Sequence, residues 1–390
     1  MKPETPLCAR AAVRALAASK IRELYNEGIG RTDVAAFWVG EPDEPTPEFI
    51  REAGSDSIAA GELFYTHNLG IPELREALAA YLSTLHRPVE AGRIAVTTAG
   101  VNALMLASQL IVDPGDRVVE VVPLWPNLLE IPKILGASVA TVPLRFSPAG
   151  WKLDLGRLLD ALTPGTRALY LNSPNNPTGW TITREEQKAV LEHCRRHGIW
   201  IFADDAYERL YYGPGGIAPS FLELMDEADR VVSANTFSKS WLMTGWRLGW
   251  LVVPPGLVAD LGKLIEYNTS CAPVFVQRAG VAALKGGEPV IARTVARFRR
   301  ARDFLVERVG HLPGVSVARP DGTMYAFLHI EGMSDSLGFC KRLVREHGLG
   351  LAPGAAFGPE GEGYVRWCFA ASEERLADGV RRLARALEAR

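Results

Sequence analysis

The sequence lacks the excess of positive charge that nucleic-acid-binding proteins carry. Its 390 residues include 43 Lys and Arg against 45 Asp and Glu, and the formal net charge is −2. Because a nearly neutral chain offers no electrostatic attraction to a polyanion, we expect no nucleic-acid partner. The sequence also lacks an apolar run long enough to cross a bilayer and a charged-then-apolar leader. We therefore expect no membrane partner and a cytoplasmic location.

Cysteine is scarce and metal-binding patterns are missing. The cysteines are Cys8, Cys194, Cys271, Cys340 and Cys368. An odd number of widely separated cysteines suits neither a disulfide framework nor a zinc site, so we expect reduced, packed thiols. His193 and His197 are four residues apart on an expected helix, but no third ligand or H-E-x-x-H pattern accompanies them. We predict no metal.

The sequence has no G-x-G-x-x-G, which a nicotinamide-binding dehydrogenase needs after its first strand. What it does have, from about residue 45 to 285, is an alternation of short β-rich runs with helical patterns. This alternation is typical of crossover units and predicts an α/β fold, with a largely parallel sheet between helices. Functional residues are then expected at the carboxyl ends of the strands.

The pattern changes after about Gly286. Two helical stretches are expected around Val290 to Val309, followed by strands and helices typical of a smaller α+β domain. Near the start, an Ala-rich helix is expected over Ala11 to Arg22. We predict a large domain of residues 44–285 and a small domain made of residues 1–43 and 286–390. A cleft between the two is the expected binding site.

One lysine stands in an environment that makes a charged amine costly. In SANTFSKSWLMTGWRLGW, residues 233–250, Lys239 lies between Ser238 and Ser240. The neighbouring bulky side chains are Trp241, Met243, Trp246 and Trp250. A lysine in a polar loop is most often a surface residue, but an ammonium among these side chains is poorly solvated. Forming an imine with an aldehyde consumes the amine and uses its lowered pKa.

This segment resembles the lysine site of the class I and II aminotransferases, which are pyridoxal-phosphate enzymes of fold type I. The resemblance implies pyridoxal 5'-phosphate as cofactor, a Schiff base on Lys239, and a phosphate held by Thr236, Ser238 and Arg247. Hydroxyls and a guanidinium suit a dianionic phosphate because they are directional, charge-assisted donors. It also implies a sheet of the seven-stranded type in the large domain.

Two further motifs agree with this family. In NSPNNPTG, residues 172–179, the NPTG alone is an ordinary turn, but the resemblance places Asn176 at the cofactor's phenolic oxygen. In FADDAY, residues 202–207, the paired acids could be solvent-facing or metal ligands. The resemblance instead implies that Asp204 keeps the pyridine nitrogen protonated and that Tyr207 donates to the phenolic oxygen. Asp205 is assigned no chemistry.

The phosphate and the ring of the cofactor have further candidates upstream. In VTTAGVNALMLA, residues 96–107, a strand joins a helix, and backbone N–H groups at a helix start can bind an anion. The resemblance assigns Gly100, Val101 and Asn102 to this phosphate loop. Trp125 follows the next strand in VVPLWPNL, where an isolated tryptophan usually only packs. The family stacks an aromatic side chain on the cofactor ring at this point.

The remaining motifs concern the substrate and a second subunit. Arg366 lies mid-strand in GYVRWCFA, a poor place for an unpaired charge, and it matches the arginine that grips the substrate's α-carboxylate. Gly40 in VGEPD and Asn176 are expected beside that carboxylate. Tyr65, in a segment that resembles Y-T-x-x-x-G-x-x-x-L-R, is expected to reach the phosphate of the neighbouring subunit in a homodimer.

Together these motifs predict an aminotransferase that moves an amino group from an L-amino acid to a 2-oxo acid, with Lys239 carrying protons. The alternative is a lyase, cyclase or oxidase with the same site. Val101 stands where aspartate-specific relatives of one subgroup have lysine, which favours a neutral, aromatic or basic donor. A regulator would need a helix-turn-helix extension, and a catalytically dead homologue would have lost Lys239 or Asp204.

Overall fold

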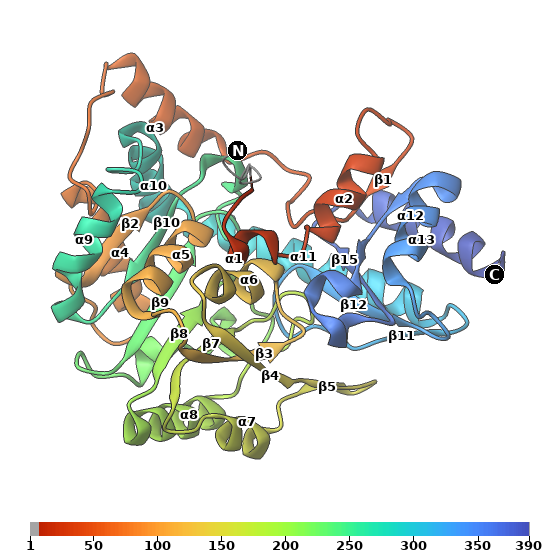
Figure 1. Ribbon diagram of the computed structural model, residues 1–390. Coiled ribbons are helices and arrows are strands. Elements are labelled where there is room, and N and C mark those ends of the chain that lie inside the picture. The colour runs from red at the N-terminus through yellow and green to blue at the C-terminus, as the bar shows by residue number, and fades with distance from the viewer. Residues whose placement is uncertain (1–7, 390) are drawn as a thin grey trace, which may run out of the picture.

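The computed structural model describes residues 8–389 and has a large sheet on one side and a smaller sheet on the other (Figure 1). The helices are α1 (Ala11–Arg14), α2 (Lys20–Glu27), α3 (Glu48–Ala59), α4 (Pro72–Leu85), α5 (Gly100–Ile111), α6 (Pro126–Ile134), α7 (Leu155–Ala161), α8 (Arg184–His197), α9 (Val258–Glu266), α10 (Val274–Gly286), α11 (Glu288–Gly310), α12 (Ser336–His347) and α13 (Glu373–Glu388). The strands are β1 (Ala35–Ala36), β2 (Ile94–Thr97), β3 (Arg117–Val122), β4 (Ser138–Pro143), β5 (Arg145–Ser147), β6 (Gly150–Lys152), β7 (Thr166–Asn172), β8 (Trp200–Asp204), β9 (Val231–Thr236), β10 (Gly249–Val252), β11 (Val315–Val317), β12 (Tyr325–Ile330), β13 (Leu349–Gly350), β14 (Ala352–Pro353) and β15 (Tyr364–Cys368). Within residues 8–389, no helix is long and apolar enough to cross a membrane. A cytoplasmic location stays a prediction.

The large sheet has seven strands in the order β2-β10-β9-β8-β7-β3-β4. Strand β10 runs antiparallel to both of its neighbours, and the pairs from β9 through β4 are parallel. The seven-stranded, mostly parallel sheet expected from the sequence is confirmed. Because parallel strands end at one edge, the segments that follow β3, β7, β8 and β9 meet there.

Helices cover both faces of the large sheet, as the alternating pattern predicts. On one face, side chains of α5, α6 and α9 pack on alternate residues of the central strands, such as Val118, Tyr170 and Phe202. On the other face, α4, α8 and α10 pack on the intervening residues, such as Val119 and Leu169. Burial on both sides explains why these strands read as continuous apolar runs rather than alternating ones.

The small sheet is antiparallel, in the order β11-β12-β15-β14. Helix α11 packs on β11 and α13, and α12 packs on β13 and β14. The N-terminal segment joins this part of the fold, because β1 pairs in parallel with β13 through Ala35↔Leu349 and Ala36↔Gly350. The division into a small domain of residues 1–43 and 286–390 and a large domain of residues 44–285 stays a prediction.

Two helix predictions were wrong in detail. The single helix expected over Ala11 to Arg22 is two helices, α1 and α2, because the Oγ of Ser19 caps a new helix by accepting from the N–H of Arg22 at 3.2 Å. The two stretches expected around Val290 to Val309 are one helix, α11, of 23 residues. No glycine or proline interrupts the sequence between those two positions.

Strand β3 contains a carboxyl group that sequence analysis did not single out. Glu120 has no exposed surface, and neither carboxyl oxygen has a hydrogen-bond partner among residues 8–389. Burial raises the pKa of Glu120 to about 8, with Lys133 opposing the shift and Glu130 adding to it. The folded protein therefore holds this side chain as a neutral acid at neutral pH.

We expect Glu120→Gln to remove a pH dependence of stability. In the unfolded chain Glu120 loses its proton near pH 4.3, whereas the folded protein keeps it to about pH 8. The native state thus binds more protons in this interval, so its free energy of unfolding falls as pH rises from about 4 to 8, by roughly 4 kcal/mol. Denaturant unfolding across this range should show the decline in the parent and in Glu307→Gln, an exposed control on α11, and lose it in Glu120→Gln. Parallel curves for all three proteins would contradict the assignment.

Candidate active site

A cavity of about 550 Å³ lies at the edge where the central strands of the large sheet end, and side chains from both parts of the fold line it. Of the residues predicted for the site, those that line it are Gly40, Gly100, Val101, Trp125, Asn176, Asp204, Tyr207, Thr236, Ser238, Lys239, Arg247 and Arg366. Asn102 and Tyr65 are not among its lining residues. The structure therefore brings twelve of the fourteen predicted side chains together from segments spread over the whole chain.

Lys239 is held at the end of β9, with its amine inside the cavity. The Nζ donates a hydrogen bond to the carbonyl oxygen of Gly40 at 2.7 Å and lies 5.8 Å from the centre of the Tyr207 ring. Burial is the main reason that the pKa of Lys239 is lowered to about 8. The charges of Arg366 and Arg247 act in the same direction, and Cys368 and Glu41 oppose them. An appreciable fraction of this amine is thus neutral and nucleophilic at physiological pH.

Hydroxyls and one guanidinium surround the start of α5. The Oγ1 of Thr236 lies 2.9 Å from the Oγ of Ser238, and the Nη1 of Arg247 donates to that Ser238 oxygen at 3.4 Å. Gly249 makes the close approach possible, because a Cβ there would lie 2.7 Å from the backbone nitrogen of Gly100. The helix start, two hydroxyls and an arginine form a cradle that fits a dianionic phosphate.

Two predicted residues lie elsewhere in the structure. The Nδ2 of Asn102 donates to the Oδ1 of Asn268 at 2.9 Å, and its Oδ1 accepts from Thr98 at 3.2 Å, so its side chain is engaged outside the cavity. Tyr65 is 88% exposed and has no role in the cavity of its own chain. The assignments of Asn102 and Tyr65 stay predictions.

Asp204, at the end of β8, is the buried carboxylate of the cavity. One carboxyl oxygen accepts from the N–H of Ala206 at 3.2 Å, and burial raises the pKa of Asp204 to about 7 although Lys239 opposes the shift. A buried carboxyl that accepts so few hydrogen bonds from its surroundings is suited to bind a cationic group. Asn172 joins this strand end to the NPTG loop, since it donates to the Asp204 carbonyl and accepts from the N–H of Asn176.

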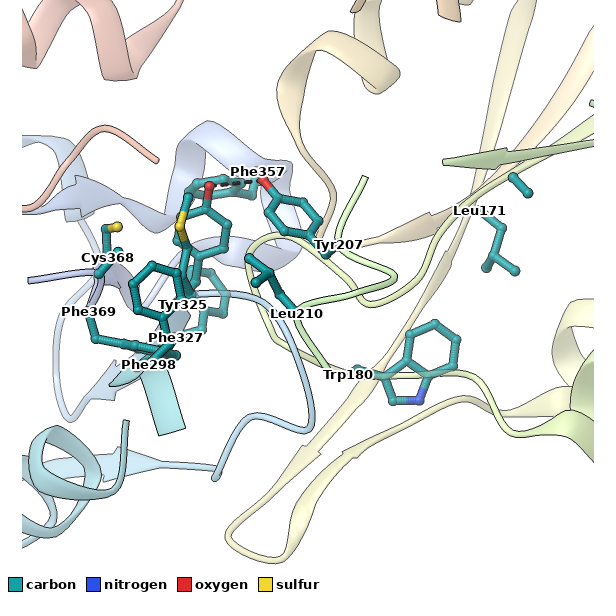
Figure 2. Close-up of a cluster of buried hydrophobic side chains, with 14 of the residues drawn as sticks. Leu171, Trp180, Tyr207, Leu210, Phe298, Tyr325, Phe327, Phe357, Cys368 and Phe369 are labelled. Carbon is teal, nitrogen blue, oxygen red and sulfur yellow. Dashed lines mark hydrogen bonds between the residues drawn. The ribbon is translucent and has the colours of Figure 1, made fainter. Parts of the chain in front are cut away.

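Tyr207 contacts a residue that sequence reasoning missed. Its hydroxyl lies 2.9 Å from the hydroxyl of Tyr325, and Figure 2 shows the two hydroxyl groups pointing toward each other. Burial raises the pKa of Tyr207 well above its usual value and that of Tyr325 to about 12, so both remain neutral donors. Tyr325 belongs to an apolar strand pattern, and nothing in that pattern distinguishes it from a core aromatic.

Arg366 is 2% exposed. Its guanidinium carbon, Cζ, lies 4.4 Å from the centre of the Tyr325 ring and 4.9 Å from the centre of the Phe357 ring. Its Nη1 donates to the Oδ1 of Asn176 at 3.1 Å, and its Nη2 donates to the carbonyl of Trp38. Its Nε has no partner within residues 8–389. An oriented guanidinium with a spare buried donor is suited to bind a carboxylate.

The N-terminal segment also contributes lining residues that the sequence did not identify. Trp38 and Glu41 flank the predicted Gly40, and Arg22 and Tyr25 come from α2. Trp38 lies just before the G-x-P-D pattern and Glu41 lies within it, so this pattern could have indicated both as lining residues. No local pattern indicates that α2 lies over the cavity, because that placement depends on the long-range pairing of β1 with β13.

The sequence from residue 32 to residue 383 matches the family model described as aminotransferase class I and II. The chain belongs to this family. It is 33% identical over 374 residues to an aspartate aminotransferase of Pyrococcus horikoshii, with 95% of each chain covered. It is also 34% identical to an arginine–pyruvate transaminase of Pseudomonas aeruginosa, over 90% of this chain and 89% of the other. The predicted aminotransferase class is confirmed.

Solved structures agree with the fold of this aminotransferase. An aspartate aminotransferase from Thermus thermophilus, determined with maleate, superimposes with a TM-score of 0.90 at 30% identity, covering 98% of this chain and 100% of the other. An aminotransferase from Mycobacterium tuberculosis superimposes with a TM-score of 0.91 at 28% identity, covering 99% and 100%. The predicted fold class is confirmed, and the enzyme acts on amino acids and 2-oxo acids as its family does.

Proposed function

We propose that this aminotransferase binds pyridoxal 5'-phosphate covalently through Lys239 and moves the amino group of an L-amino acid to a 2-oxo acid. The observation that carries the proposal is the position of Lys239 in the cavity. Its buried amine lies in one cavity with an anion cradle, the carboxyl of Asp204 and the guanidinium of Arg366. No single role other than an amino-acid-converting site uses all four groups.

Each part of the cavity matches one part of the proposed cofactor. The start of α5 with Ser238 and Arg247 suits the phosphate, and the aromatic side chain of Trp125, which lines the cavity, suits the ring. Asp204 suits the ring nitrogen, and the neutral hydroxyl of Tyr207 suits the phenolic oxygen. When bound, this cofactor supplies an electron-withdrawing ring that acidifies the Cα–H bond of an attached amino acid.

The chain's own residues then bind the substrate and move the proton. Arg366 holds the α-carboxylate through donors that Asn176 and Trp38 orient. Lys239, once its amine is free, accepts the proton from the substrate Cα as a general base within the same cavity. The surrounding aromatic side chains limit the access of water to this amine.

We propose that the enzyme is a homodimer. The exposed large apolar side chains include a group between residues 58 and 65, and Phe64 is 86% exposed beside Tyr65 at 88%. Contiguous exposed aromatic and aliphatic side chains are typical of a surface that another protein covers. In this proposal a second copy covers Ile58, Leu63 and Phe64, and Tyr65 reaches the phosphate in the neighbouring cavity.

Tyr65→Phe should weaken cofactor binding without dissociating the dimer. Loss of one hydrogen bond to a charged phosphate costs about 1.5–3 kcal/mol, so the cofactor dissociation constant should rise by about tenfold or more. Fluorescence titration of the cofactor-free protein measures this constant, and sedimentation checks the dimer. Tyr267→Phe, equally exposed but outside the 58–65 group, is the matched control. An unchanged constant would contradict the contact proposed for Tyr65, and a monomeric parent protein would refute the dimer proposal.

Transamination is tested by mixing the holoenzyme with single amino acids, without a 2-oxo acid and without oxygen. We expect one equivalent of 2-oxo acid per active site and no ammonia, followed by full recovery of the starting absorption when a 2-oxo acid is added. Continuous release of ammonia would indicate the lyase alternative, and turnover that begins only when oxygen is admitted would indicate the oxidase. Because apolar Val101 lines the cavity, we expect aspartate to be a poor donor in this assay.

A further inference from the structure

A second cavity of about 770 Å³ adjoins the active site. Its walls come from α6, β4, residues 17–20 and the loop of residues 355–362. The two cavities share four lining residues, which are Ser19, Val101, Pro126 and Asn127. Since these residues border both spaces, the second cavity lies next to the cavity that contains Arg366.

The second cavity is apolar along most of its wall. Side chains from α5, α6, β4 and the loop of residues 355–362 supply this character, and they include Met105, Leu129, Ile131, Ile134, Val139 and Ala355. Binding of aliphatic or aromatic groups to such a surface is favourable, and the stabilisation increases with the apolar area that is buried.

The charged residues that line the second cavity are of both signs, with three glutamates and two lysines. Glu130 is paired with Lys133 at 2.8 Å, and Glu362 accepts from the N–H of Ser336 at 2.7 Å. The remaining charged lining residues are one of each sign, Lys20 and Glu360. A distal carboxylate on a substrate would meet this excess of negative charge, and the apolar wall is covered best by a side chain without charge.

We propose that this second cavity is the side-chain subsite of the enzyme and that its donor is an amino acid with a large, uncharged, apolar side chain. The inference rests on the proposed function, since it requires the α-carboxylate to be held by Arg366. The substrate's side chain passes Val101 and Asn127 and lies against α6 and Met105. Small donors such as alanine leave this surface uncovered.

A series of straight-chain L-amino acids from 2-aminobutyrate to 2-aminooctanoate tests the subsite. We measure kcat/KM of the half-reaction for each member with the holoenzyme. Burial of each added methylene should raise kcat/KM by about fourfold until the cavity is filled. Alkanoates of the same lengths, titrated calorimetrically into the cofactor-free protein, should show the same stepwise gain in affinity, because they need only Arg366 and the subsite.

Substitutions on α5 separate the subsite from its surroundings. Met105→Trp fills the second cavity and should remove the rise of kcat/KM with donor chain length. The longest donors then lose most of their advantage over 2-aminobutyrate. Gln109→Trp places the same side chain one turn later, at an exposed position outside both cavities. In this variant kcat/KM should rise with donor chain length as it does in the parent. Ala355→Phe, from the opposite wall, provides a second blocking variant if Met105→Trp does not fold.

The outcomes distinguish this inference from the function on which it rests. If kcat/KM rises with donor chain length in the parent and both blocking variants remove this rise, the subsite is supported. If amino acids are converted but kcat/KM is flat or falls beyond 2-aminobutyrate, or if neither blocking variant alters the slope, the subsite is overturned while the aminotransferase assignment stands. If no donor of any length yields a 2-oxo acid, the proposed function itself fails.

Discussion

Lys239→Ala should abolish covalent attachment of the cofactor and lower turnover by about 10²–10⁴-fold or more. The substitution removes both the nucleophile that holds the cofactor and the base that takes the Cα proton, and a general base alone contributes about that factor. The rest of the cavity keeps its phosphate cradle and Asp204, so the variant should still bind the cofactor noncovalently. Absorption spectra after gel filtration, with single-turnover rates, measure the two losses separately.

The pH dependence of attachment gives an independent check on Lys239. Only the neutral amine attacks an aldehyde, and burial lowers the pKa of this lysine to about 8. The rate at which the cofactor-free protein binds pyridoxal phosphate covalently should therefore rise with pH and level off above about pH 8. Lys188→Ala, which removes an exposed lysine on α8, should behave as the parent does. Parental turnover in Lys239→Ala would remove the basis of the proposed mechanism.

Asp204→Asn should lower kcat/KM by about 10²–10³-fold with little loss of stability. The amide keeps the size of the side chain but carries no charge, so it cannot hold a proton on the ring nitrogen of the bound cofactor. The loss of one preorganised electrostatic partner in a buried site typically costs this much. The comparison is made on kcat/KM of the half-reaction, with thermal unfolding measured in parallel.

The adjacent acid provides the matched control for Asp204. Asp205 is equally buried, but its carboxyl accepts from the hydroxyl of Ser233 at 2.6 Å and does not line the cavity. Burial and the nearby Glu208 raise the pKa of Asp205, and Asp205→Asn leaves every lining residue of the cavity in place. We expect Asp205→Asn to keep kcat/KM within a few-fold of the parent. Equal losses in both variants would mean that Asp204 has no special role.

In one part of the site that the sequence predicted, spacing along the chain fixes the geometry. Lys239, Ser238 and Arg247 lie within one segment, so the end of β9 and the turn after it bring them together. The alternation of strands and helices likewise predicted the parallel sheet, because a crossover connection places successive strand ends at one edge.

The parts that the sequence did not predict depend on contacts between distant segments. Tyr325 meets Tyr207 only because the small sheet packs against the end of β8, 118 residues away in sequence. The second cavity forms where residues 17–20, α6 and the loop of residues 355–362 meet, and none of these has a local pattern that indicates a binding surface. Glu120 was missed for a similar reason, since only the packed helices show that its carboxyl is unpartnered.

The most direct test of the account is to locate the cofactor on the chain. The holoenzyme is reduced with borohydride, digested, and analysed by mass spectrometry for peptides that carry the added mass of the reduced cofactor. We predict one modified peptide, with the modification on Lys239, and its loss when an amino acid donor is added before reduction. Modification of a different lysine, or of none, would contradict the account.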